Sequence, residues 1–397
     1  MPALTKRFAS LPRYLLATIP EKKRALIARG VDVIDLGAGD ADLSPPPEAI
    51  AALRTALDEP TIHRYGFGLG LPAFREAACA WMKKRFGVSF DPMTEFVPLI
   101  GSKEGISHLA FAYIDDGDVA LIPDPGYLAY LGGTLLSEGR AHTIPLRPEN
   151  KFLVDVDAIP ADIAKRAKIL YLNYPNNPTA ATAPNDYLAH VVTWCKQHDV
   201  LLVYDNAYSE LAFDGYVPPS IFEIDGARDV ALEFHSMSKT YNMTGWRCGW
   251  AVGKAEFAGT LAKVKSFIDT GQFMAVQRAA VAALGAWADF VPGNVATFKQ
   301  RRDAAVAAFR AEGFACEPPR ATMYLWLPLP AGVLSTAFHE RLIEEEGVIV
   351  LPGRGLGEGG EGFFRVSFIT APERIAEAAK RAGRVLRKMQ AGLASHA

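Results

Sequence analysis

Between about residue 95 and residue 255, short apolar runs alternate with longer amphipathic stretches along the chain. The short runs predict strands, and their near-continuous apolar character predicts burial on both faces of a sheet. They cover residues 96–100, 119–123, 168–173, 200–205, 231–236 and 248–253. The longer stretches at 103–114 and 185–198 predict helices. Strands that alternate with helices are typical of βαβ units, so we expect an α/β domain with a mostly parallel sheet covered by helices.

The two ends of the chain follow a different pattern. After about residue 290, long helical patterns at 298–313 and 372–392 enclose two strand-like runs at 323–329 and 363–369. This mixture predicts a smaller α+β domain. We expect an N-terminal arm that contributes to the small domain, a large domain and a C-terminal small domain, over residues 1–45, 46–290 and 291–397.

Composition limits the classes of function. The chain has 397 residues, half of them apolar, and its 42 Lys and Arg nearly balance 44 Asp and Glu. A net charge of −2 argues against a nucleic-acid or membrane-surface partner. The four cysteines are scattered, without metal-ligand spacing or the density of a secreted disulfide framework, so no metal site is expected. The first residues are too polar for a signal peptide, and no apolar run is long enough to span a membrane. We therefore expect a cytoplasmic protein that acts on small molecules.

One glycine-rich tract imitates a cofactor motif. The sequence GEGGEG at 357–362 matches the G-x-G-x-x-G dinucleotide fingerprint. That fingerprint needs a strand before it and a helix after it, so that the pyrophosphate meets a helix N-terminus. Here the tract runs into the strand-like FFRVSFI, and we expect no dinucleotide site.

The strongest chemical signal is the block HSMSKTYNMTGWRCGW at 235–250. Lys239 stands among the hydroxyls of Ser236, Ser238 and Thr240, and Arg247 follows eight positions later. A lysine forms an imine with an aldehyde only as the neutral amine, which burial or nearby positive charge favours. Hydroxyls and a guanidinium can hold a phosphate. The block therefore combines a lysine in a setting suited to imine formation with neighbours suited to a phosphate.

This block resembles the S-x-S-K-x-x-x-x-x-G-x-R signature of the class I/II pyridoxal-phosphate-dependent aminotransferases, and further motifs of that family follow in order along nearly the whole chain. The resemblance implies the fold-type-I architecture, with pyridoxal 5′-phosphate bound to Lys239 as a Schiff base. It also implies a phosphate cradle built from GSKEG at 101–105, with Ser102 and Lys103 acting beside Ser236, Ser238 and Arg247. Because GSKEG opens a predicted helix, its backbone N–H groups lie at the positive end of the helix dipole.

The same resemblance assigns the residues around the cofactor ring. It implies that Tyr127 stacks on the ring and that Asn177, in NYPNNPT, donates to the phenolic O3′ together with Tyr208. Asp205 closes an apolar strand, where a carboxylate is costly without a partner. In the family that partner is the protonated pyridine nitrogen, which makes the ring an electron sink.

Substrate contacts are implied for Arg365, Gly37, Asn177 and Tyr130. Arg365 in FFRVSF would clamp the α-carboxylate by its planar fork. Gly37 would approach the substrate through its backbone. The chain departs from the family pattern at Ala180, where a glycine is usual, and at Ala41, where a proline is usual. Tyr65 matches a tyrosine that reaches the phosphate of the neighbouring subunit, so we expect a homodimer with shared sites.

These assignments imply an aminotransferase that works by a ping-pong cycle, in which Lys239 acts as the general base for the proton on the substrate Cα. The motifs are most similar to the LL-diaminopimelate aminotransferase branch, with 2-oxoglutarate as the acceptor. Glu104 and Tyr130 are candidates for reading a distal ammonium group. Aspartate, alanine and aromatic aminotransferases and the β- or γ-lyases of the same fold remain alternatives. A ligand-sensing regulator is disfavoured, because the chain has no added DNA-binding segment.

Overall fold

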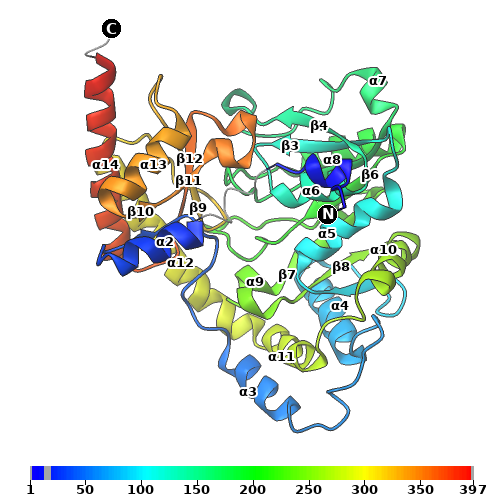
Figure 1. Cartoon of the computed structure of the whole chain (residues 1–397). Helices are drawn as coiled ribbons and strands as arrows, with labels where there is room; N and C mark the ends of the chain where they lie inside the picture. Colours follow the sequence, from blue (N-terminus) through cyan, green and yellow to red (C-terminus); the bar gives the residue numbers. More distant parts are fainter. Residues whose placement is uncertain (1, 13–18, 395–397) are drawn as a thin grey trace.

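The computed structural model describes residues 2–12 and 19–394. Parts of the predicted N-terminal arm, residues 1 and 13–18, lie outside the described residues, as do residues 395–397. The strands form a seven-stranded sheet of order β2-β8-β7-β6-β5-β3-β4, a three-stranded sheet β11-β12-β9 and a two-stranded pair β1-β10 (Figure 1). Within the large sheet only β8 runs antiparallel to its neighbours. The predicted α/β class with a mostly parallel sheet is confirmed.

The strands of the large sheet are β2 (Phe96–Leu99), β3 (Val119–Asp124), β4 (Arg140–Pro145), β5 (Ala167–Leu172), β6 (Leu201–Asp205), β7 (Ala231–Ser236) and β8 (Gly249–Gly253). The smaller sheets contain β1 (Ile34–Asp35), β9 (Tyr324–Pro328), β10 (Val348–Ile349), β11 (Leu351–Pro352) and β12 (Phe363–Ser367). The predicted strands at 96–100, 119–123, 168–173, 200–205, 231–236 and 248–253 therefore all exist, to within one residue at each end.

The α-helices are α1 (Lys6–Ala9), α2 (Ile19–Ala28), α3 (Pro47–Ala56), α4 (Pro72–Phe86), α5 (Ser102–Tyr113), α6 (Leu128–Leu136), α7 (Ala161–Ala164), α8 (Asn185–His198), α9 (Met237–Thr240), α10 (Ala255–Ile268), α11 (Met274–Gly285), α12 (Trp287–Ala311), α13 (Ser335–Glu346) and α14 (Pro372–Ala394). Two short 3₁₀ helices, η6 (Gly353–Leu356) and η7 (Glu358–Gly360), precede β12. The predicted helices at 103–114 and 185–198 are α5 and α8.

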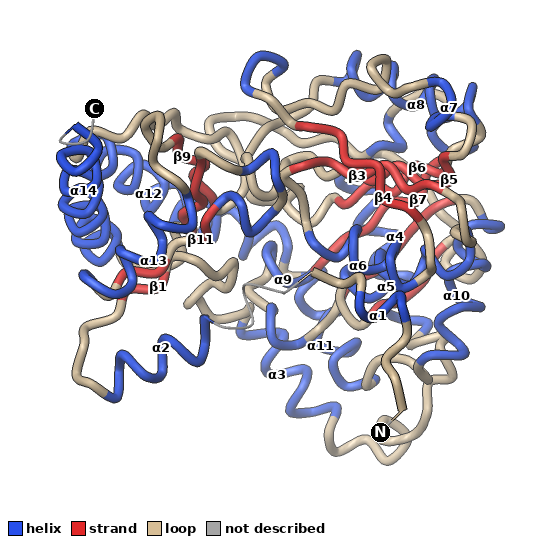
Figure 2. The backbone as a smooth tube through the Cα atoms, turned by 45° about the horizontal axis from the view of Figure 1, so that its top comes forward, coloured by secondary structure: helices blue, strands red, loops and turns tan. Residues whose placement is uncertain are grey.

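Helices cover both faces of the large sheet, as Figure 2 shows. Successive residues of β5 enter opposite cores: Ile169 and Tyr171 pack with α5 and α10, whereas Leu170 and Leu172 pack with α8. Because strand side chains alternate between faces, burial on both sides requires apolar residues at every position. This explains the continuous apolar runs in the sequence.

Strand β4 was not predicted from the sequence. It lies at the edge of the sheet, pairs only with β3 and is half exposed along its length. Its residues RAHTIP carry polar side chains outward, so the apolar run that revealed the inner strands is missing. Edge position is therefore the physical reason for the omission.

The three-stranded sheet lies apart from the large sheet and packs against the C-terminal helices (Figure 1). Helix α12 links the two regions, since its first turns pack beside α11 and its later turns against α14. This single helix runs through residue 290, where a domain boundary was predicted. From the N-terminal part of the chain, β1 pairs with β10, which joins residues 34–35 to residues 348–349.

In the described part of the chain, no helix is both long enough and apolar enough to cross a membrane.

Candidate active site

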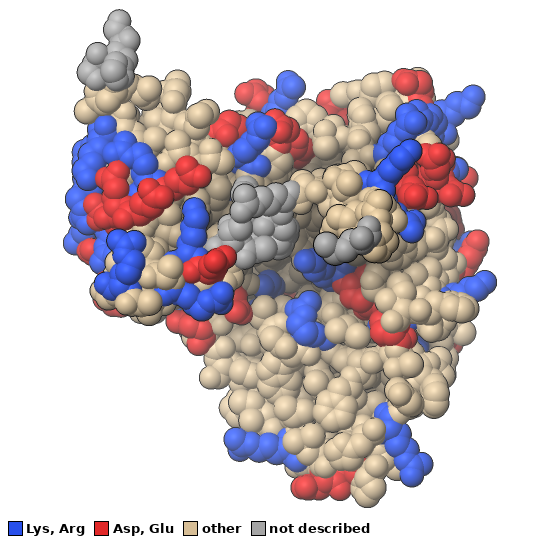
Figure 3. Space-filling model, viewed as in Figure 1, with Lys and Arg blue, Asp and Glu red and all other residues tan. Residues whose placement is uncertain are grey.

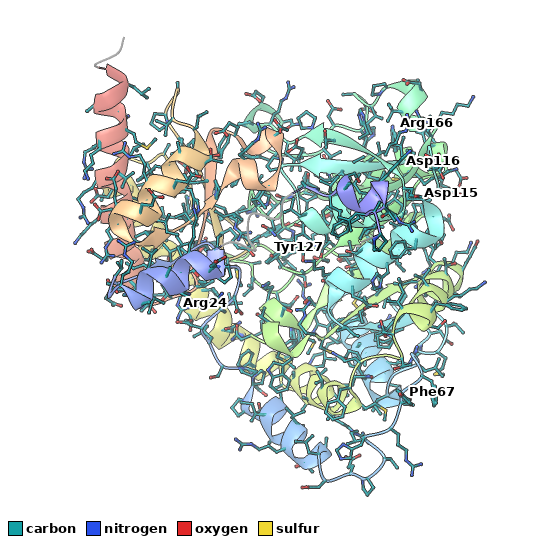
Figure 4. The ribbon with its side chains drawn as sticks, in the orientation of Figure 1. Arg24, Phe67, Asp115, Asp116, Tyr127 and Arg166 are labelled. Carbon is teal, nitrogen blue, oxygen red and sulfur yellow. The ribbon has the colours of Figure 1, made fainter. Side chains whose placement is uncertain are left out.

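A cavity of about 220 Å³ opens between the carboxyl ends of the parallel strands and the three-stranded sheet. Ligands of open α/β sheets bind at these strand ends, because the loops that follow them converge there. Figure 4 shows Tyr127 in the middle of the molecule, between the two regions. The lining residues are Gly39, Ser102, Lys103, Tyr127, Leu128, Asn173, Asn177, Asp205, Ala207, Tyr208, Ser236, Ser238, Lys239, Thr244, Arg247, Tyr324, Leu356 and Arg365. Most of the residues singled out in the sequence are thus brought to one cavity.

Lys239 lies on α9, directly after β7, and its amine donates to the carbonyl oxygen of Gly39. Burial lowers the pKa of this amine, and the nearby positive charges of Arg365 and Arg247 lower it further. A lowered pKa favours the neutral amine, which is the form that condenses with an aldehyde. The environment of Lys239 therefore suits an imine-forming lysine.

Asp205 ends β6 at the base of the cavity and is 5% exposed. Its Oδ2 accepts a hydrogen bond of 3.0 Å from the Tyr130 hydroxyl, while its buried Oδ1 has no partner among the described residues. Burial raises the pKa of this carboxyl to about 6. An unpartnered buried carboxylate oxygen is costly, and a cationic N–H donor in the cavity would satisfy it. Pyridoxal phosphate carries such a donor on its ring nitrogen, so this residue fits the cofactor.

One end of the cavity is built to hold an anion. Helix α5 begins at Ser102, and the N–H groups of its first turn lie at this end of the cavity. Gly101 adopts a φ of +75°, and a Cβ atom there would stand 2.5 Å from Nη2 of Arg247. Only glycine at position 101 lets the guanidinium lie against the start of the helix. The cradle therefore combines helix N–H groups with a fixed arginine.

Lys103, Ser236 and Ser238 complete that end of the cavity. Burial and the nearby positive charge of Arg247 lower the pKa of Lys103. The Ser236 side chain accepts from the backbone N–H of Ser238 and so caps α9. Two cations and two hydroxyls at one place match a phosphate group.

Arg365 of β12 reaches the cavity from the three-stranded sheet. Its Nη1 donates to Oδ1 of Asn177 and its Nη2 to the carbonyl oxygen of Gly37, each at 2.6 Å. Its guanidinium carbon lies 4.1 Å from the ring centroid of Tyr324. Gly37 and Asn177 are thus both in direct contact with the arginine that the sequence singled out as the carboxylate clamp.

The loop after β5 is held by its first asparagine. The Asn173 side chain donates to the carbonyl oxygen of Asp205 at 2.7 Å and accepts from the backbone N–H of Asn177 at 2.7 Å. Ala180 in the same loop has a φ of +59°, in the left-handed region. Glycine adopts this conformation without steric cost, which explains why glycine is usual there in the resembled family.

Four of the candidate residues do not line the cavity: Gly37, Tyr65, Glu104 and Tyr130. Gly37 contacts a lining residue, because its carbonyl oxygen accepts from Arg365 Nη2. Tyr130 is buried, its hydroxyl donates to Oδ2 of Asp205, and it is not among the residues that line the cavity. Glu104 accepts from Lys265 and from the backbone N–H of Ile100, each at 3.0 Å, so its carboxylate is engaged within the protein. A role of Glu104 or Tyr130 in reading a distal ammonium group stays a prediction, and both side chains are engaged within the protein. Tyr65 is 69% exposed, away from the cavity of its own chain.

Several lining residues were missed in the sequence. Tyr324 lies in MYLWLPL, which reads only as an apolar strand, so nothing local distinguished it. Asn173 could have been found, because it is the first residue of the NYPNNPT motif. The others are Gly39, Leu128, Ala207, Thr244 and Leu356, which are residue types without a chemical signature of their own.

Comparison with known proteins agrees with this geometry. The sequence model of the family Aminotransferase class I and II matches residues 31–381. The chain is 48% identical to an LL-diaminopimelate aminotransferase of Desulforudis audaxviator, over 95% of this chain and 96% of that protein. It is 45% identical to another of Moorella thermoacetica, over 97% of this chain and 99% of that protein.

Solved structures with the same fold include a substrate-bound BacF from Bacillus subtilis, with a TM-score of 0.93 and 33% identity. That match covers 97% of this chain and 98% of the other. A probable N-succinyldiaminopimelate aminotransferase from Thermus thermophilus follows, with a TM-score of 0.88 and 38% identity over 93% of this chain and 99% of the other. The predicted family is confirmed: the chain belongs to the class I and II aminotransferases, which depend on pyridoxal phosphate.

Proposed function

We propose that this aminotransferase takes the amino group of LL-diaminopimelate and passes it to 2-oxoglutarate by a ping-pong cycle. Relatives of nearly full length that carry the name LL-diaminopimelate aminotransferase, at 45–48% identity, support this substrate. One structural observation supports the reaction class most strongly. Lys239, Arg365 and the unpartnered oxygen of Asp205 all line one cavity. All four cysteines are free and buried, which is consistent with a reducing compartment such as the cytoplasm.

Each residue has a defined task in this proposal. When bound, pyridoxal phosphate supplies an aldehyde that condenses with amines and a ring that accepts the electron pair left at the substrate Cα. Asp205 Oδ1 keeps a proton on the ring nitrogen, and the N–H groups of α5 with Ser102, Arg247 and the neighbouring hydroxyls hold the phosphate. Tyr127 would pack on the ring, and Tyr208 and Asn177, which also line the cavity, would donate to its phenolic oxygen.

The substrate is oriented by its α-carboxylate. Arg365 binds both carboxylate oxygens by its fork, and the Gly37 carbonyl and Asn177 side chain hold the guanidinium in place. Lys239 lies in the same cavity, where its Nζ would remove the proton from the substrate Cα and return it on the cofactor side. Its desolvated amine is a stronger candidate for this transfer than a solvated lysine, because it is neutral more often near pH 7.

We also propose a homodimer and retain the division into an arm, a large domain and a small domain at residues 45 and 290. Support for the dimer comes from large apolar side chains that are exposed on the loop around residue 67, at the end of α10 and just after it: Tyr65, Phe67, Leu69, Phe267, Ile268 and Phe273. A hydrogen bond of 3.0 Å from Gly68 N to Thr270 O joins the two segments into one surface. Figure 3 shows few charged side chains over α3 and α11 beside it. Apolar patches of this kind mark protein interfaces, and here Tyr65 would reach the partner's phosphate.

The test is a single half-reaction followed by absorbance. Purified protein loaded with pyridoxal phosphate is mixed with LL-diaminopimelate in the absence of an oxo acid. We expect the visible absorption of the lysine-bound cofactor to disappear as the amine form of the cofactor accumulates. Subsequent addition of 2-oxoglutarate restores the first spectrum and releases glutamate.

Other outcomes separate the alternatives. Conversion with aspartate, alanine or an aromatic amino acid but not with LL-diaminopimelate would leave the reaction class intact and refute the substrate. Release of ammonia together with an oxo acid, without any acceptor, would instead identify a lyase. Retention of the visible band in Lys239→Ala would show that another residue binds the cofactor.

A further inference from the structure

Tyr324 is a large aromatic residue that reaches the cavity from β9. It is 2% exposed, and its position opposite Ser367 places it diagonally next to Arg365 on the same face of the three-stranded sheet. This placement explains why the Arg365 guanidinium lies over its ring, at 4.1 Å from the centroid. The Tyr324 ring therefore makes a cation–π contact with the Arg365 guanidinium.

The hydroxyl of Tyr324 contacts the other side of the cavity. It lies 2.9 Å from the hydroxyl of Tyr208, which follows β6 of the large sheet, so this hydrogen bond joins the two sheet regions. Both phenols are buried among apolar residues of one core, where an unpaired hydroxyl would be costly. The bond is therefore well protected from water.

The N-terminal segment leaves room for this hydroxyl. A Cβ atom on Gly39 would stand 2.2 Å from the Tyr324 oxygen, so any residue other than glycine would displace the phenol. The carbonyl oxygen of the same Gly39 accepts from Lys239. The Tyr324 side chain is thus packed against Arg365, Tyr208 and the backbone of Gly39.

We propose that Tyr324 is a positioning residue that fixes the carboxylate clamp Arg365 relative to the ring-facing hydroxyl of Tyr208. Its ring sets the plane of the guanidinium, and its hydroxyl sets the Tyr208 phenol. The distance between the substrate carboxylate and the reacting Cα then depends on a contact between the two sheet regions. This inference rests on the proposed roles of Arg365 and Tyr208.

Two substitutions separate the ring from the hydroxyl. Tyr324→Phe keeps the ring under Arg365 and removes the bond to Tyr208, whereas Tyr324→Leu removes both. The first readout is the dissociation constant of glutarate, a dicarboxylate without an amino group, on the cofactor-loaded protein. We expect Tyr324→Phe to bind it within about twofold of the unsubstituted protein and Tyr324→Leu to bind it about tenfold more weakly, since a desolvated guanidinium loses its aromatic support.

The second readout is the pH midpoint of the visible absorption of the resting loaded protein. Hydrogen bonds in a chain strengthen one another, so loss of the Tyr324 hydroxyl weakens the donor bond of Tyr208. We expect the midpoint to rise in both variants by a few tenths of a pH unit or more. The charged groups around Tyr208, namely Asp205, Lys239 and Arg365, are the same in both.

Tyr187 offers a matched control, because its buried hydroxyl donates to Val154 O away from the cavity. Tyr187→Phe should change neither readout. Unchanged glutarate binding and an unchanged midpoint in both Tyr324 variants would overturn the proposal, as would equal weakening of glutarate by Phe and Leu. If Arg365→Leu also binds glutarate normally, the proposed clamp is wrong, which is a separate failure.

Discussion

At the scale of single residues, Asp205 combines features that a carboxyl group in water lacks. Its side chain is buried, one oxygen accepts from Tyr130, and the other faces the cavity without a partner among the described residues. The Tyr130 hydroxyl fixes the rotamer, so the free oxygen always points at the same place. A group that is costly in the empty protein thus becomes an attachment point once a cationic ring nitrogen arrives.

This cost makes the stability of the cofactor-free protein depend on pH. Burial raises the pKa of Asp205 from 3.8 to about 6, so the folded state binds the proton more tightly than the unfolded state. The contribution of the protonated Asp205 to the free energy of unfolding is fully present below about pH 4. It is lost as the pH rises through about 6. Relative to Asp205→Asn, the unsubstituted apoprotein should lose up to about 3 kcal/mol between about pH 4 and pH 7.

Urea unfolding of both apoproteins at several pH values measures this difference. The exposed Asp225→Asn serves as the control and should run parallel to the unsubstituted protein. Parallel curves for Asp205→Asn as well would mean that Asp205 is not desolvated in the free chain.

Site residues could be predicted from the sequence where their side chains are charged and stand within a motif. Lys239, Arg247, Asp205 and Arg365 carry charges in otherwise apolar or small-residue surroundings, so a motif exposes them in the sequence. Tyr324 could not be predicted, because its role comes from a diagonal contact between strands and a bond to a residue more than a hundred positions away. Tyr130 was found, but the direction of its side chain was not.

At the scale of elements, the segment with η6 and η7 shows what the glycine-rich tract does. Gly359 N donates to Oδ1 of Asp124 at 3.0 Å, and Gly126 N donates to the carbonyl oxygen of Leu356 at 2.9 Å. These two hydrogen bonds attach the segment of η6 and η7 to the end of β3 and hold Leu356 at the cavity. The strand predicted after GEGGEG, in place of the helix that a dinucleotide site needs, is confirmed by β12.

Substitution of Gly357 should disrupt the contact between this segment and the end of β3. Gly357 has a φ of +138°, and a Cβ atom there would stand 1.9 Å from Oδ1 of Asp124. Gly357→Ala should therefore lower the free energy of unfolding by about 2 kcal/mol or more, through strain and steric conflict, and raise KM for the amino donor.

Gly259→Ala is the matched control, since Gly259 lies on α10 with open space around its Cα. Denaturant unfolding and steady-state kinetics test both variants. An unfolding curve for Gly357→Ala that coincides with that of the control would show that the segment accommodates a side chain.

The elements themselves were largely predictable, because the inner strands of the large sheet are apolar on both faces and α8 and α14 are long and periodic. The two-residue strands β1, β10 and β11 gave no pattern, since they are too short to show a period. Strand β4 was hidden by its exposed edge, as described above.

At the scale of the whole molecule, the exposed apolar surface around Tyr65 is the proposed dimer interface. Phe67, labelled in Figure 4, is 75% exposed and Phe267 is 87% exposed, so neither contributes much to the fold of its own chain. Phe67→Asp combined with Phe267→Asp should convert the dimer to a monomer while leaving the melting temperature of the monomeric fold nearly unchanged. Analytical ultracentrifugation measures the mass directly.

A shared site adds a second readout to this experiment. Because Tyr65 would complete the partner's phosphate cradle, the monomeric variant should also bind pyridoxal phosphate more weakly, by about tenfold or more. Val217→Asp, at an exposed apolar residue elsewhere, is the control. A variant that stays dimeric would place the interface on another surface.

The pairing of β1 with β10 also has a consequence for the order in which the protein is made. The N–H of Ser367 donates to the carbonyl oxygen of Leu36, and Arg365 binds the carbonyl oxygen of the next residue, Gly37. The hydrogen-bond partners of Leu36 and Gly37 are thus synthesised more than three hundred residues after them. A nascent chain that ends before residue 365 cannot bring this arginine against the backbone of Gly37. During synthesis, the substrate site accordingly cannot be completed before residue 365 has been added.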